Sequence, residues 1–114
     1  MTATLANFTS ETQLGVTDSQ LVSTSTSETK FIGKATVTNT STSNVEVTIW
    51  RILTATTATE GSGGNWLIRE TIPAGRTVPL TKLMQHVLGP TMAIKAKADT
   101  ASVVNIDISG TTEA

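Results

Sequence analysis

The most constraining feature of this sequence is a strict alternation of apolar and polar residues in its C-terminal third. Apolar residues occupy every second position over residues 92–98 and again over residues 104–108. Successive side chains of a β-strand point to opposite faces, so this period of two predicts two half-buried strands. Because Thr100-Ala101 separates the runs as a turn, we expect an antiparallel hairpin that ends at Gly110.

The same alternation recurs in the middle of the chain. Residues 31–38 and 45–50 form two further runs, joined by a polar hexapeptide at 39–44, and we expect another antiparallel hairpin here. The alternation places Phe31 and Val37 on one face of the first strand and Ile32 on the other. Residues 65–72 predict a further strand, after a segment at 54–64 that predicts a loop or a long hairpin tip.

The N-terminal residues 1–27 are polar, with scattered apolar positions that predict one or two short strands and a loop at 23–27. They form either an N-terminal arm that orders on a partner or an edge strand of the domain. In total, about seven short antiparallel strands with regular turns predict an all-β fold. We expect a single β-sandwich domain over residues 1–114.

One short helix is expected near residues 79–88. Five apolar residues fall at i, i+3, i+4, i+7 and i+8, the spacing of one helical stripe, namely Leu80, Leu83, Met84, Val87 and Leu88. Pro79 suits the first turn of a helix, and Gly89-Pro90 suits its end. A helix of this length is unstable alone, so we expect it to pack on the sheet.

Composition narrows the partners of the chain. Threonine, a β-branched residue that suits the solvent face of a sheet, accounts for 24 of the 114 residues. The net charge of −1 does not provide the basic surface that nucleic acid or an anionic membrane requires, so we expect neither as a partner. The chain has no cysteine, which excludes disulfides and thiolate metal sites.

We also expect neither a membrane span nor a signal peptide. No apolar stretch approaches the ~18 residues that cross a bilayer. Residues 1–10 lack a basic region followed by a long apolar run. The protein is therefore expected to act where it is synthesised, or to leave the cell inside an assembly.

Residues that could support catalysis are scattered along the chain. His86 is the single histidine and, without cysteine or a second histidine, cannot form an ordinary zinc site. The carboxylates form neither a calcium loop nor a paired acid, and no serine lies in a G-x-S-x-G motif. The glycine-rich run at 61–64 lacks the Lys-Ser/Thr ending of a phosphate loop. We expect no enzymatic activity, no metal and no cofactor.

Trp50 is the candidate interaction residue. By alternation it shares a face with Glu46 and Ile52, and Ile32 occupies the polar face of the preceding strand. An apolar patch on a polar face often marks an interface, so we predict a protein interface at Trp50, Ile52 and Ile32. The alternative is a β-bulge that reverses the alternation, or a strand end that contributes to both faces.

From Phe31 onward, the order of several motifs resembles a group of small tailed-bacteriophage proteins that are encoded among virion structural genes. The motifs are Ile32–Thr40, Val45–Ile49, Ile72–Val78 with its I-P-A-G turn, Leu88–Ala96, and Val103–Gly110 with its V-N-I-D-I-S-G run. The resemblance covers about residues 30–113. It implies a β-sandwich on the capsid surface, at the neck or along the tail, and carries over no catalytic or ligand residues.

The leading hypothesis is therefore a non-enzymatic structural component of a bacteriophage virion, acting as a capsid decoration, neck or tail accessory subunit. Its expected partners are other virion proteins and copies of itself in a homo-oligomer, and its location is the virion, assembled in the host cytoplasm. The alternative is a carbohydrate- or receptor-binding module of a phage fibre, with Trp50 stacked on a sugar, although aromatic residues make up only 4% of the chain. A small hydrolase is a third class, but it lacks a catalytic constellation.

Overall fold

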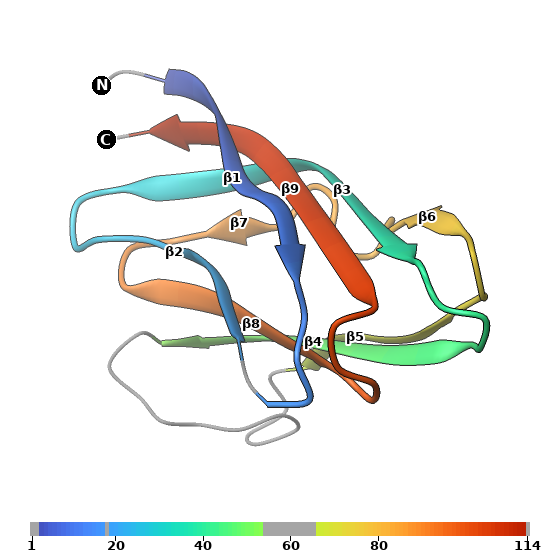
Figure 1. The fold of residues 1–114 in the computed structure, drawn as a ribbon. Helices are drawn as coiled ribbons and strands as arrows, with labels where there is room; N and C mark the ends of the chain where they lie inside the picture. The colour runs from blue at the N-terminus through green and yellow to red at the C-terminus, as the bar shows by residue number, and fades with distance from the viewer. Residues whose placement is uncertain (1–2, 18, 54–65, 114) are drawn as a thin grey trace.

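The computed structural model describes residues 3–17, 19–53 and 66–113, and within these ranges the chain forms nine β-strands (Figure 1). They are β1 (Ala3–Gln13), β2 (Ser19–Ser23), β3 (Thr29–Asn39), β4 (Val45–Leu53), β5 (Trp66–Ile72), β6 (Thr77–Pro79), β7 (Val87–Leu88), β8 (Met92–Ala98) and β9 (Val104–Glu113). The segment 54–64, predicted to be a loop or a long hairpin tip, lies outside the described residues.

The strands form two antiparallel sheets that pack face to face (Figure 1). Sheet A has the order β1-β9-β3-β6, with β7 also paired to β3, and sheet B has the order β2-β8-β4-β5. The predicted all-β sandwich is confirmed. The strand β1 forms an edge of sheet A, and β2 forms an edge of sheet B.

Both predicted hairpins are wrong, because the strands in each pair belong to different sheets. β3 lies in sheet A and β4 in sheet B, and the same separation holds for β9 and β8. Each polar connection is an arch that carries the chain across the sandwich. The alternation of apolar and polar residues predicts which face of a strand is buried, but not which strand it pairs with. An arch places two consecutive strands in different sheets, with their apolar faces turned toward each other across the core.

The core between the sheets is formed by the inward-facing residue of each alternating pair. Its fully buried members include Val37 on β3, Ile49 on β4, Ile94 on β8 and Ile106 on β9. Leu14 closes the core after β1. Burying a side chain of this size contributes about 1.5–3 kcal/mol.

The helix expected near residues 79–88 is absent, and the segment forms a turn between β6 and β7. The amide of Leu80 donates to the carbonyl of Ala35 over 2.9 Å, and the amide of Gln85 donates to the carbonyl of Ile32 over 2.6 Å. Both amides therefore donate to main-chain carbonyls of β3 rather than to carbonyls within a helix. Gln85 also has a φ of 69°, outside the right-handed helical region, so a helix cannot continue through it. The residues predicted to form the apolar stripe of a helix lie instead in this turn and in β7, and two of them, Leu80 and Leu83, are buried in the core.

A β-bulge in β3 reverses the predicted alternation. Ile32 is paired with Gly110 on β9, but the next pair is Lys34 with Ser109, so Gly33 is an extra residue. As a result Ile32 lies in the core, whereas Phe31 points outward and is 41% exposed. The strand β9 also continues through Gly110 to Glu113, past its predicted end.

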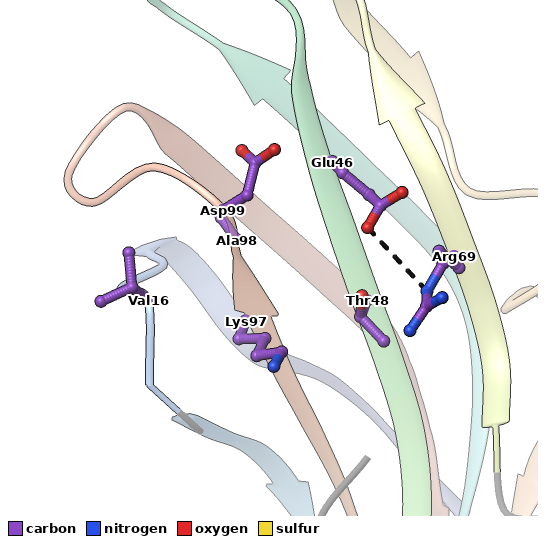
Figure 2. Close-up of a pocket in the computed structure, with 7 residues that line it drawn as sticks. All are labelled: Val16, Glu46, Thr48, Arg69, Lys97, Ala98 and Asp99. Atoms are coloured by element: carbon purple, nitrogen blue, oxygen red, sulfur yellow. Dashed lines mark ion pairs between the residues drawn. The ribbon is translucent and has the colours of Figure 1, made fainter. Parts of the chain in front are cut away.

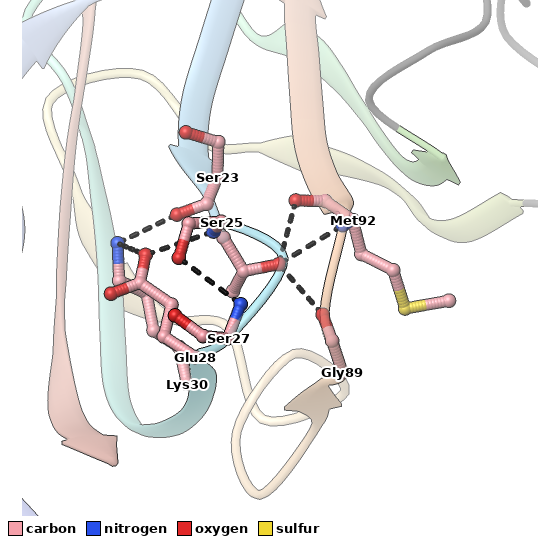
Figure 3. A network of polar contacts seen from close by, with 8 residues as sticks. Ser23, Ser25, Ser27, Glu28, Lys30, Gly89 and Met92 are labelled. Atoms are coloured by element: carbon pink, nitrogen blue, oxygen red, sulfur yellow. Dashed lines mark hydrogen bonds and ion pairs between the residues drawn. The ribbon is translucent and has the colours of Figure 1, made fainter. Parts of the chain in front are cut away.

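Of the run predicted as a loop at 23–27, Ser23 ends β2 and residues 24–27 form a loop that is held by polar contacts (Figure 3). The buried Thr24 hydroxyl donates to the carbonyl of Gly89 over 2.6 Å and accepts from the amide of Met92 over 3.0 Å. Lys30 donates to the carbonyl of Ser23 over 2.6 Å. The Thr24 bonds connect the loop to the start of β8, and the Lys30 bond connects β3 to the end of β2.

Candidate functional site

A row of apolar side chains crosses the outer face of sheet A. Leu5 on β1 and Phe31 on β3 are both directly opposite Thr111 on β9, and Phe31 is also opposite Val87 on β7. Directly paired residues project from the same face of a sheet, so these four residues form one line across four strands. We call Leu5, Thr111, Phe31 and Val87 the apolar row.

The apolar row is open to solvent. The exposed fractions are 85% for Leu5, 41% for Phe31 and 48% for Val87. Along with Val16, these are the large apolar side chains that are exposed among the described residues. Leu5, Phe31 and Val87 lie on one line rather than scattered over the surface, and grouped exposed apolar side chains are common at contact surfaces.

A shallow groove of about 540 Å³ runs beside the row, and its lining is mainly apolar. Leu5 and Phe31 contribute its walls, and Gly33 and Gly110 line it between them. Since glycine has no side chain, the bulge leaves a hollow into which an outside group can fit.

The rest of the outer face of sheet A is polar. Thr36, Thr38 and Asp107 project from it, and the Thr38 hydroxyl lies 2.8 Å from that of Thr77 on β6. Phe31 and the other members of the apolar row lie toward the start of β3, whereas Thr36 and Thr38 lie toward its end. Such a division suits an apolar contact with a polar rim.

A second depression lies on the outer face of sheet B and holds about 190 Å³ (Figure 2). Glu46 and Arg69 form an ion pair across it at 3.9 Å, and Lys97 and Asp99 complete its charged lining. The Arg69 side chain is 41% exposed and the Glu46 side chain is 47% exposed, so water screens their attraction and the pair contributes little to stability.

The three residues predicted to form an exposed interface are buried. Ile32 is 0% exposed and belongs to the main core. Trp50 and Ile52 do project from the outer face of sheet B, but they are 0% and 5% exposed and form a small cluster with Ala93. These three residues therefore do not form the exposed apolar patch that the interface hypothesis requires. The Trp50 Nε1 atom is buried without a hydrogen-bond partner in the described part of the chain.

The residues considered for metal binding stay apart. Within the ranges that the structure describes, no three histidine, aspartate or glutamate side chains gather to hold a metal ion. His86 is partly buried, and its main-chain carbonyl accepts from the amide of Ile32 over 2.9 Å. In the same ranges, no helix is long and apolar enough to cross a bilayer.

The sequence pattern does not predict the apolar row, because uninterrupted alternation through Gly33 assigns Phe31 to the core and Ile32 to the outer face. The structure shows the reverse, since Ile32 is 0% exposed and Phe31 is 41% exposed. A glycine inside a strand is a known signal of a bulge, so Gly33 could have revealed the change of phase. Leu5 and Val87 could not have been joined to Phe31, because the pairing of β1, β9 and β7 is not encoded locally.

Comparisons with known proteins give little further guidance. No family model matches the chain, and no curated protein matches it. One solved structure, titled as that of infectious bursal disease virus Gt strain, shares a TM-score of 0.36 and 11% sequence identity, and the match covers 97% of this chain. This chain spans 32% of the length of that one. A likeness of this size carries no argument for fold or function.

Proposed function

We propose that this protein is a non-enzymatic structural subunit of a bacteriophage virion, a capsid decoration, neck or tail accessory protein, which acts by protein–protein assembly. The observation that carries the proposal is the apolar row. Three large apolar side chains lie exposed on one line of a sheet face that the fold leaves uncovered. Covering them would remove apolar surface from water at about 25 cal/mol per Å².

The motif order over residues 30–113 supports the virion setting, through its resemblance to small tailed-phage structural proteins. The carbohydrate-binding alternative relied on a Trp50 ring that could stack on a sugar. Trp50 is 0% exposed, so that alternative lacks its binding residue.

The test is uptake of the purified protein onto virions assembled without it, measured by co-sedimentation. We expect saturable, stoichiometric uptake of the unaltered chain and a loss of at least tenfold in affinity for Phe31→Glu, because a carboxylate would be buried against an apolar partner. The matched control is Thr38→Glu, which adds the same charge to the polar half of the same face and should bind normally. Uptake that ignores Phe31→Glu, or no uptake at all, would refute the proposal.

A further inference from the structure

We infer that the partner that covers the apolar row is a second copy of this chain, packed face to face about a two-fold axis that runs along the row. This inference rests on the proposed function, since it names the occupant of the same surface. It follows from the positions of two charged residues relative to the row.

The charges flank the row symmetrically. On β9, Thr111 lies in the row, Glu113 lies two residues to one side, and Ser109 lies two residues to the other. Ser109 is paired with Lys34 on β3, so Lys34 projects from the same face. Each charge therefore lies about 7 Å from the row along the strands, one positive and one negative.

A two-fold axis along the row exchanges the two flanks. The Lys34 side of one copy then lies over the Glu113 side of its partner, and the reverse contact forms at the same time. The two residues are on neighbouring strands, so their lateral offset is about 4.8 Å, which a lysine side chain spans. The surface is thus self-complementary, with an apolar centre and an ion pair on each side.

Both charged groups are available for such a pair. Lys34 and Glu113 are exposed, and neither takes part in the ion pairs found among the described residues, which join Lys30 to Glu28 and Arg69 to Glu46. In this arrangement Lys34 faces Glu113 of the other copy rather than another lysine. If the two copies packed face to face with the same flanks together, Lys34 of one copy would lie over Lys34 of the other, which is unfavourable.

The size of the face predicts a weak dimer. The nine positions from 105 to 113 span about 27 Å along β9, and four strands of sheet A span about 19 Å, so the face presents roughly 500 Å² per copy, or roughly 1,000 Å² in total. This area lies below the usual range of stable complexes, so we expect a dissociation constant in the micromolar to millimolar range. Contacts of this strength become effective when many copies are held close together in a particle.

Pairing through the free edge of β1 is a less suitable route to a dimer. Its register with β9 shifts between Asn7 and Thr9 and again between Thr9 and Thr12. Such irregularities interrupt the row of free backbone groups that another strand would need, and proteins use them to block edge pairing.

The inference is tested by sedimentation equilibrium of the full chain with a charge-exchange series. Lys34→Glu and Glu113→Lys, each alone, should weaken dimerisation about tenfold, because each places like charges together. The double variant should return to within about twofold of the unaltered chain. At about 1 M salt, where charges are screened beyond ~3 Å, the four proteins should dimerise alike. Lys82→Glu, an equal charge change in the turn after β6, is the matched control and should have no effect.

Single variants that weaken the dimer without rescue in the double variant would refute the two-fold pairing. A chain that is monomeric at millimolar concentration would also refute it. If such a monomer still binds virions in a manner that Phe31→Glu abolishes, the partner is another virion protein and the proposed function stands. If Phe31→Glu has no effect on either measurement, both proposals fail.

Discussion

The side-chain amide of Asn39 donates a hydrogen bond of 3.0 Å to the main-chain carbonyl of Ile72, which joins the end of β3 in sheet A to the end of β5 in sheet B. The same amide donates to the carbonyl of Ser43 over 2.8 Å, and its oxygen accepts from the amide and hydroxyl of Ser41 at 2.9 and 2.7 Å. Asn39 is 0% exposed, and its side chain makes these four hydrogen bonds in and beside the arch between β3 and β4.

We predict that Asn39→Ala lowers the free energy of unfolding by about 2–3 kcal/mol, because buried carbonyl and amide groups lose their partner. Asn39→Asp should destabilise at least as much, since it replaces two donors with a charge next to two carbonyl oxygens. Denaturant unfolding followed by circular dichroism measures both. Asn44→Ala is the control: Asn44 is exposed and accepts one bond of 3.2 Å, from Ala74, so a change above about 0.5 kcal/mol would count against this account.

The close approach of β9 and β3 at Gly110 provides a second prediction. A Cβ atom there would overlap the carbonyl oxygen of Phe31 and lie 2.9 Å from the amide nitrogen of Gly33. Both are backbone atoms that cannot move without shifting the strand, so Gly110→Ala should lower stability by about 3 kcal/mol. Thermal unfolding by calorimetry is the measurement.

Gly33→Ala is the matched control for that experiment. The nearest atoms to a Cβ at Gly33 are 3.7 and 3.8 Å away, which is ordinary contact. We expect a change within about 1 kcal/mol of either sign. Equal losses for the two variants would show that the bulge is not where the register places it.

Thr24 is predicted to stabilise the loop between β2 and β3 through its hydroxyl rather than its shape. Thr24→Val keeps the β-branched shape but leaves the carbonyl of Gly89 and the amide of Met92 without this partner, so unfolding should become easier by about 1–2 kcal/mol. Thr26→Val, at an exposed position in the same loop, should change stability by less than about 0.5 kcal/mol. Urea denaturation separates the two.

Leu5 is predicted to serve association rather than folding. It is 85% exposed, so Leu5→Ser should change the free energy of unfolding by less than about 0.5 kcal/mol while weakening assembly. Leu14→Ala, at a position that is 1% exposed, should instead lower stability by about 2–5 kcal/mol. Parallel unfolding and sedimentation measurements test this contrast, and a large loss of stability in Leu5→Ser would contradict it.

Local patterns were enough to predict the fold class and most strands. The alternation over residues 92–98 and 104–108 matches β8 and β9, and the I-P-A-G turn follows β5 as expected. Strand partners were not predictable, because the arches at 39–44 and 99–103 have the same polar composition as hairpin turns. The prediction of a helix near residues 79–88 was wrong, because the amides of Leu80 and Gln85 donate to carbonyls of β3. This is a long-range contact that no local pattern reveals.

The candidate site depended on long-range pairing even more strongly. Trp50 and Ile52 project from the outer face of sheet B, as alternation predicts, yet they are buried. Phe31, assigned to the core, is exposed because one extra residue at Gly33 changes the phase of β3. A surface that is assembled from β1, β3, β7 and β9 becomes visible only when their register is known.

The most direct test of the account is the distance between two copies, measured by pulsed dipolar electron spin resonance with a spin label at Thr36→Cys. The chain has no native cysteine, so the label is unique. Thr36 is paired with Asp107, four residues along β9 from Thr111, so a two-fold axis along the apolar row places the labels roughly 30 Å apart. We predict that distance in the unaltered chain and its loss in Phe31→Glu. A dimer with a clearly different distance, or one that persists in Phe31→Glu, would contradict assembly through this face.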